Sequence, residues 1–164
     1  MRRTDPDRAP STGSAGYTLV ELVVVIAIGG VLAAFVAPRF WSQQTFSDRG
    51  YADELAAALR VAQKVAVLTG CPARVTVSAT GYAAAQQAAS GNACNPSDST
   101  WTTPVLATDG SPVQDNAPNG TAVSPTGVFQ FDDQGRLSAS PGTTLSVGTH
   151  TITIVTGTGL VQVQ

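Results

Sequence analysis

Residues 51–78, YADELAAALRVAQKVAVLTGCPARVTVS, change from a helical to a strand pattern within one short segment. In the first part, apolar side chains recur at steps of three and four, which is typical of a helix with one buried face. Gly70 and Pro72 then form a helix stop, because glycine accepts the left-handed cap and proline cannot continue the helix. From Ala73 onward, apolar and polar residues alternate as in a half-covered strand. The segment therefore predicts a helix followed by β structure.

The face of this helix that we expect to be buried is rich in alanine and leucine. It comprises Tyr51, Leu55, Leu59, Ala62 and Ala66, widened by Val61, Val65 and Leu68. Arg60 and Lys64 fall on another side of the helix, where we expect solvent or a neighbouring subunit.

The rest of the chain reads as short strands joined by turns. A hairpin is expected from 73–78 and 82–87, with its turn at Thr80–Gly81. Further strands are expected at 101–107, 128–131, 136–140, 143–147, 151–155 and 160–163. Segments 88–100 and 108–126 are expected to be loops. Such strands need a cover for one face, and the amphipathic helix supplies it. The predicted fold class is α+β, with a β-rich globular domain over residues 70–164.

Charge argues against one class of partner. The chain has 164 residues, of which 12% are charged, and a net charge of −2. After Arg74 the only basic residue is Arg136, whereas this part of the chain contains several aspartates. They are Asp98, Asp109, Asp115, Asp132 and Asp133. A negative distal half does not attract phosphate backbones by charge, so nucleic-acid binding is not expected.

Upstream of the amphipathic segment lies an apolar run over residues 17–37. As a helix it measures roughly 30 Å, which matches the hydrocarbon thickness of a bilayer. Arginines precede the run, so the positive-inside bias predicts a cytoplasmic N-terminus and an extracytoplasmic C-terminal domain. A secretory signal or a simple single-span anchor is the plainer interpretation. However, no clear small-x-small cleavage site follows the run. One helix over residues 17–69 is expected, and Pro38 is a place where it can bend.

Glu21 is unexpected within this run. A charged side chain at bilayer depth costs at least about 2.5 kcal/mol and is retained mainly where it has a partner or a function. The alternative is that the carboxylate reaches the headgroup region near the helix end.

The segment from Gly16 to Leu22, GYTLVEL, follows a short basic leader and precedes the apolar run. It resembles the prepilin cleavage and methylation motif of type IV pilins and type II secretion pseudopilins. The family usually has Phe where this chain has Tyr17. The resemblance implies that residues 1–16 are a leader, removed after Gly16 by the prepilin peptidase, and that Tyr17 is then N-methylated. It also implies contact with an inner-membrane assembly platform and a bend at Pro38.

The resemblance gives Glu21 a partner. Cleavage after Gly16 makes Tyr17 a cationic amine, which can lie beside Glu21 of a neighbouring subunit in a stack of parallel helices. Leaving either charge alone in hydrocarbon costs about 3 to 5 kcal/mol, so the pair penalises a wrong register. We therefore expect Glu21 to act in assembly.

Two further segments, 49–64 and 129–136, are similar to minor pseudopilins and pilins of the GspH, FimT and MshC types. This similarity implies a low-abundance subunit that initiates or decorates a type IV pilus or a type II secretion pseudopilus. Some FimT-like minor pilins bind DNA through a basic C-terminal region, which is one alternative. Here residues 157–164 contain no Arg or Lys. The other alternative is a simple membrane-anchored periplasmic protein with a single span.

Cys71 and Cys94 both fall on the predicted extracytoplasmic side, where an oxidising compartment allows a disulfide. Metal binding is the weaker interpretation, because two cysteines with one remote histidine do not match zinc-ligand spacing. That histidine, His150, lies in a Thr-rich strand and is not expected to act as a general base. Asp132 and Asp133 resemble a calcium loop only faintly. We expect no catalytic residues, no metal and no cofactor.

Overall fold

The computed structural model describes residues 17–90, 93–95 and 97–164, with the backbone alone at 34–43, 89–90 and 93. By contacts, the chain divides into two compact units, residues 1–39 and residues 40–164. The described part contains one helix, α1, from Leu19 to Thr69, followed by short strands. The α+β class is therefore confirmed.

The end of α1 follows from its sequence. Gly70 adopts a left-handed φ of 67°, and the hydroxyl of Thr69 donates to the carbonyl oxygen of Val65 at 2.8 Å. The N–H of Cys71 in turn donates to the Thr69 hydroxyl at 3.2 Å. The Thr69 side chain thus links the last turn of α1 to the residue that follows Gly70. The predicted stop at Gly70 and Pro72 is confirmed.

The first sheet has the order β5-β2-β1-β8-β9, and β6 also pairs with β2. The hairpin of β1 and β2 was expected, and Val75 lies opposite Ala84 on one side and Phe129 on the other. The strands are β1 (Ala73–Ser78), β2 (Gly81–Gln86), β5 (Thr103–Pro104), β6 (Gln114–Asn116), β8 (Gly127–Phe131) and β9 (Leu137–Ala139).

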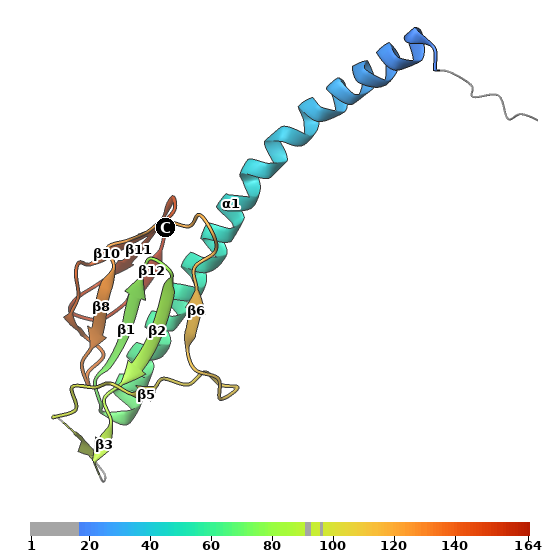
Figure 1. Cartoon of the computed structure of the whole chain (residues 1–164). Coiled ribbons are helices and arrows are strands. Elements are labelled where there is room, and N and C mark those ends of the chain that lie inside the picture. Colours follow the sequence, from blue (N-terminus) through green and yellow to red (C-terminus); the bar gives the residue numbers. More distant parts are fainter. Residues whose placement is uncertain (1–16, 91–92, 96) are drawn as a thin grey trace, which may run out of the picture. The chain divides into compact units, whose positions relative to one another are not determined.

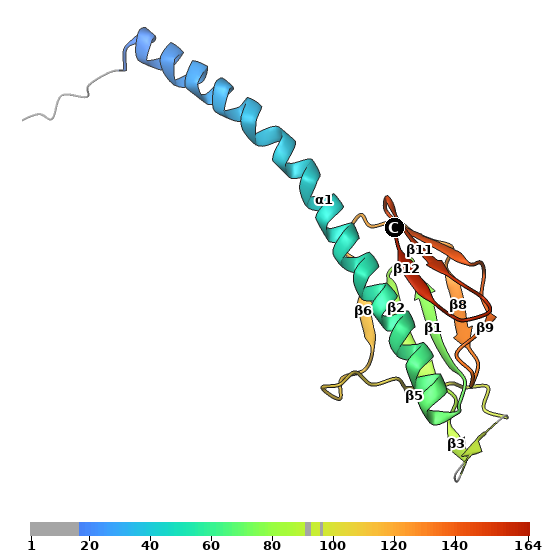
Figure 2. The same cartoon turned by 180° about the vertical axis from the view of Figure 1, so that it is seen from behind.

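The second sheet has the order β12-β11-β10-β7 and is antiparallel. Its strands are β7 (Val123–Ser124), β10 (Thr144–Val147), β11 (His150–Ile154) and β12 (Val161–Val163). A separate two-stranded ribbon joins β3 (Ala89–Ser90) to β4 (Ala93–Cys94). Figure 1 and Figure 2 show both sheets beside the C-terminal part of α1.

One apolar core joins the helix to both sheets. Alternating residues of β1 and β8 point into it, as the period-two pattern predicted. The largest fully buried side chains are Leu55, Leu59, Val75, Val77, Val105, Phe129, Phe131, Leu145, Val147, Ile152 and Ile154. The five central residues of the predicted helix stripe, from Tyr51 to Ala66, are all buried.

Two expectations for the helix faces are wrong. Leu68 was expected to widen the buried stripe but is 83% exposed, because it lies in the last turn of α1, outside the core cluster. Arg60 was expected on the exposed side but is half-buried. Its guanidinium donates to the carbonyl oxygen of Val161 at 3.0 Å, which ties α1 to β12.

Three loop and strand boundaries also differ from expectation. The predicted strand 101–107 is reduced to β5, with an isolated bridge between Leu106 and Pro112. The predicted loop 108–126 contains β6 and β7, and the predicted loop 88–100 contains β3 and β4. Because these strands are two or three residues long, they depend on tertiary partners and show little sequence periodicity. The β6 strand approaches β2 closely since Gly81 has no Cβ to meet the Asp115 backbone.

A buried carboxylate fixes the globular domain to the middle of α1. Asp48 is 7% exposed. Its Oδ1 accepts the hydroxyl of Thr121 at 2.7 Å and the amide of Gln44 at 2.9 Å. A side chain at Gly148, whose φ is 55°, would overlap with this carboxylate. The helix, the segment before β7 and the β10–β11 turn therefore meet at Asp48.

Candidate functional site

The N-terminal turn of α1 is built by Thr18. The Thr18 hydroxyl accepts the N–H of Glu21 at 3.2 Å, and the Thr18 carbonyl oxygen accepts the N–H of Leu22 at 3.2 Å. Thr18 is thus the N-cap, and Glu21 occupies the third helical position. This spacing, Thr-x-x-Glu, is that of a capping box. Sequence reasoning missed this cap, although the spacing alone could have indicated it.

The processing site lies at the boundary of the described residues. Gly16 and the predicted leader, residues 1–16, fall outside them, so cleavage after Gly16 stays a prediction. Tyr17 precedes the helix, and its side chain is 86% exposed. The predicted mature N-terminus is therefore an accessible position beside the Thr18 cap.

The segment from Tyr17 to Ala33 consists mostly of apolar residues. Every residue in it is exposed, and Leu19, Val24 and Leu32 are 78%, 49% and 60% exposed. A helix that is apolar on all sides is normally covered by protein or lipid. This surface therefore requires a cover of protein or lipid.

A search of the described residues finds no helix that is both long enough and apolar enough to span a membrane. The predicted span over residues 17–37 is thus not found there. Its last positions, 34–37, have no described side chains.

Glu21 is the only charged residue between Tyr17 and Ala33. Within the described residues the single ion pair joins Arg136 to Asp132 at 2.9 Å. The Glu21 carboxylate accordingly has no cationic partner in that part of the chain. The predicted pairing with the amine of another subunit stays a prediction.

Pro38 lies within α1, which continues through it. Its side chain falls outside the described ones, and the predicted bend at this position stays a prediction.

The two cysteines form a disulfide between Cys71 and Cys94, with Cα atoms 5.3 Å apart. This bond joins the end of α1 to β4, and it confirms the predicted pairing. The described residues contain no cluster of three or more His, Cys, Asp or Glu side chains that could hold a metal ion.

The other titratable candidates have local roles or none. Asp132 accepts the backbone N–H groups of Gln134 and Arg136 and the Arg136 guanidinium, so it organises the turn after β8. Nε2 of His150 is buried and has no hydrogen-bond partner among the described residues.

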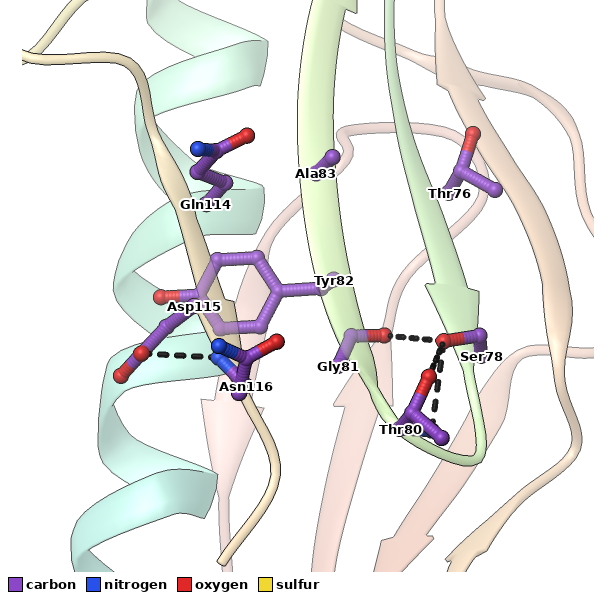
Figure 3. A pocket seen from close by; sticks show the side chains of 9 residues that line it. All are labelled: Thr76, Ser78, Thr80, Gly81, Tyr82, Ala83, Gln114, Asp115 and Asn116. Carbon is purple, nitrogen blue, oxygen red and sulfur yellow. Dashed lines mark hydrogen bonds between the residues drawn. The ribbon is translucent and has the colours of Figure 1, made fainter.

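A shallow hollow of about 410 Å³ lies at the β1–β2 turn (Figure 3). The hydroxyls of Ser78 and Thr80 stabilise the turn itself, since the Ser78 hydroxyl donates to the Gly81 carbonyl oxygen at 2.9 Å and lies 3.2 Å from the Thr80 hydroxyl. The lining residues are Thr76, Ser78, Thr80, Gly81, Tyr82, Ala83, Gln114, Asp115 and Asn116. Because the turn already uses these hydroxyls, we assign the hollow no ligand.

A second concavity, which we call the acidic groove, lies between α1 and the segment leading into β6. Its volume is about 340 Å³. It is lined by Glu54, Ala57, Ala58 and Val61 of α1, by Tyr82, and by Ala107, Pro112, Val113, Gln114 and Asp115. Figure 3 shows the Tyr82 ring beside Asp115.

The electrostatics of the acidic groove are unusual. Burial, together with hydrogen bonding to Asp115 and the negative charge of Asp115, raises the pKa of Glu54. The ring centroids of Tyr51 and Tyr82 lie 5.8 Å apart. Burial and the charges of Asp115 and Glu54 raise the pKa of each tyrosine to about 12. Sequence reasoning missed this grouping, because Asp115 lay in a predicted loop, 61 positions after Glu54 by their numbers.

Comparisons with known proteins agree with the N-terminal motif and with the globular domain. Residues 12–37 match the prokaryotic N-terminal methylation motif, and residues 51–163 match the family model described as type II transport protein GspH. The type IV narrow pilus major component PilA5 of Thermus thermophilus is 36% identical over 88 residues, covering 53% of this chain and 68% of that protein. No solved structure matches the chain. These matches confirm the resemblance to type IV pilin-like proteins of the GspH type.

Proposed function

This chain belongs to the GspH family of type II transport proteins and is a pilin-like subunit, and from that premise we propose that it is a minor pilin or pseudopilin. In this role it assembles with other pilin subunits to prime or decorate a type IV pilus or a type II secretion pseudopilus. The role is structural, and the chain itself performs no catalysis.

The observation that carries this proposal is the uncovered apolar segment from Tyr17 to Ala33. It is exposed throughout, whereas the globular unit buries its own core. A chain with a completed domain and an uncovered apolar helix needs a second environment for that helix. Lipid before assembly and neighbouring helices after assembly both provide one.

The N-terminal methylation motif around Gly16 and Tyr17 supports a proposal for processing and location. The prepilin peptidase cuts after Gly16, and Tyr17 becomes the methylated first residue. The chain then sits in the inner membrane through residues 17–37, with a periplasmic C-terminal domain. An inner-membrane platform moves it into the fibre.

We assign Glu21 the role of pairing with the Tyr17 amine of an adjacent subunit. The capping box provides a competing explanation for any defect of a Glu21 variant. Glu21→Gln separates the two, because glutamine also serves in a capping box but carries no charge. Thr18→Ala is the matched control, since it removes the cap hydrogen bond at a cost of about 1 kcal/mol and keeps the carboxylate.

The test measures the full chain in sheared fibres and in membranes of the native host. We expect Glu21→Gln to lower the fibre fraction by more than about tenfold, because the amine is left unpaired in an apolar setting. Thr18→Ala should stay close to wild type. Equal loss in both variants would assign the defect to the cap. A wild-type chain that stays in membranes and never enters fibres would favour a simple membrane anchor.

A further inference from the structure

We propose that Asn119 is a site of spontaneous deamidation, and that its isoaspartate product loosens the contact between Thr121 and Asp48. Asn119 lies in the loop between β6 and β7 and is followed by Gly120 and Thr121. The Asn119 side chain is exposed, so water reaches its amide. Water is the only other reactant, and the modification does not depend on the proposed function.

The reaction joins the main-chain nitrogen of one residue to the side-chain amide of the residue before it. The Gly120 nitrogen loses its proton to the solvent and attacks Cγ of Asn119. The new N–Cγ bond closes a succinimide ring, and the Cγ–Nδ2 bond breaks with release of ammonia. Water then opens the ring at one of its two carbonyl groups, which gives either aspartate or isoaspartate. An amide and water thus become an acid and ammonia, and nothing is oxidised or reduced.

The backbone at Gly120 leaves the attacking nitrogen available. The N–H of Thr121 donates to the Pro118 carbonyl oxygen at 3.0 Å, which closes a turn. Gly120 is the third residue of this turn and has a φ of 87°, in the left-handed region that a type II turn requires at that position. The N–H of Gly120 itself has no hydrogen-bond acceptor among the described residues. Because glycine has no side chain, nothing on Gly120 hinders ring closure.

Two comparable positions in the same domain have this nitrogen engaged. Asn116 is also exposed, but the N–H of the alanine that follows it donates to the Thr80 carbonyl oxygen at 2.9 Å. Asp109 also precedes a glycine, but the N–H of that glycine donates to the Ala107 carbonyl oxygen at 3.0 Å. An attack at either position first has to break a hydrogen bond. We therefore expect conversion at Asn119 rather than at these two positions.

The contact next to this turn joins α1 to the rest of the globular domain. The Thr121 hydroxyl is buried and donates to Oδ1 of Asp48 at 2.7 Å. The amide nitrogen of Gln44 lies 2.9 Å from the same Oδ1 and 3.4 Å from the Thr121 hydroxyl. Isoaspartate lengthens the main chain by one carbon atom just before Thr121, so the hydroxyl no longer meets Asp48. Loss of a hydrogen bond to a buried carboxylate lowers the ratio of folded to unfolded chain by roughly tenfold or more.

Fragmentation mass spectrometry of the full chain, incubated in mild detergent, tests the modification. We expect Asn119 to gain the mass difference between an amide and an acid, faster at pH 8 than at pH 5, because the attacking nitrogen must lose its proton. Asn116 in the same sample is the internal control and should stay an amide. The variant Asn119→Gln should lose the product, because glutamine has to close a larger ring. An unchanged Asn119, or equal conversion at Asn116, would overturn the inference.

Urea unfolding of the incubated chain tests the effect on Asp48. Protein isoaspartate methyltransferase measures the isoaspartate content, and chains that carry isoaspartate should unfold at a lower urea concentration than fresh wild type. Incubated Asn119→Gln should unfold as fresh protein does, which controls for other damage. Asn119→Asp adds the charge without lengthening the main chain and should unfold close to wild type. Identical unfolding of fresh and isoaspartate-containing wild type would overturn the proposed effect on the Thr121 contact.

Discussion

Replacement of the disulfide by Cys71→Ser/Cys94→Ser should destabilise the globular domain by a calculable amount. The two cysteines are 23 positions apart in sequence. Releasing a closed loop of that length increases the entropy of the unfolded chain, which corresponds to about 3.4 kcal/mol at 25 °C. The disulfide also holds β4 against the end of α1.

The assay is urea unfolding of the full chain in mild detergent, with and without a reducing agent. For a slope of about 2 kcal/mol per molar urea, the midpoint should fall by about 1.7 M. Reduced wild-type protein should unfold at the same urea concentration as the double variant, which controls for the serine side chains. A midpoint shift below about 0.3 M would refute the loop-entropy reasoning for this bond.

The remaining predictions concern the core, the acidic groove and nucleic acid. Leu59→Ala should cost about 2 to 5 kcal/mol in urea unfolding, because Leu59 is fully buried. Leu68→Ala, at an exposed position, should change stability by less than about 0.5 kcal/mol. Glu54 has a raised pKa, so the folded state binds its proton more tightly than the unfolded chain, whose pKa is near 4.5. The free energy of unfolding of the wild-type chain should therefore rise as pH falls through the raised pKa of Glu54 toward 4.5. The Glu54→Gln variant should be more stable than the wild type at pH 8 and should have no advantage over it at pH 4.5. The full chain should not shift DNA in a gel at 150 mM salt, and a tight, salt-sensitive shift would revive the DNA-binding alternative.

Local patterns predicted the parts of the fold that local chemistry determines. The stripe from Tyr51 to Ala66 follows from helical periodicity, and the helix end follows from Gly70 and Pro72. Buried and more exposed side chains alternate along β1 and β8 because one face of the first sheet covers the core. These features needed no knowledge of distant contacts.

Features that depend on distant contacts could not be predicted in the same way. The β6 strand exists because it pairs with β2, and its own sequence, Gln-Asp-Asn, has no strand pattern. For the same reason, the meeting of Glu54 with Asp115 was not visible in the sequence. The burial of Asp48 depends likewise on Thr121, 73 residues away.

The candidate N-terminal site contains one feature that the sequence predicted and one that sequence reasoning missed. The motif around Gly16 and Tyr17 was readable because processing enzymes recognise a short linear sequence, and the family match confirms the motif. The cap in which the Thr18 hydroxyl accepts the N–H of Glu21 was equally local and was missed. Which cation faces Glu21 in a fibre depends on a second molecule and is therefore a proposal.

The intact mass of the chain recovered from sheared fibres of the native host tests the central claim most directly. We predict a species that begins at Tyr17, carries one added methyl group and retains the apolar helix through the whole globular domain. Recovery of chains that still carry residues 1–16, or that lack the apolar helix, would contradict the account.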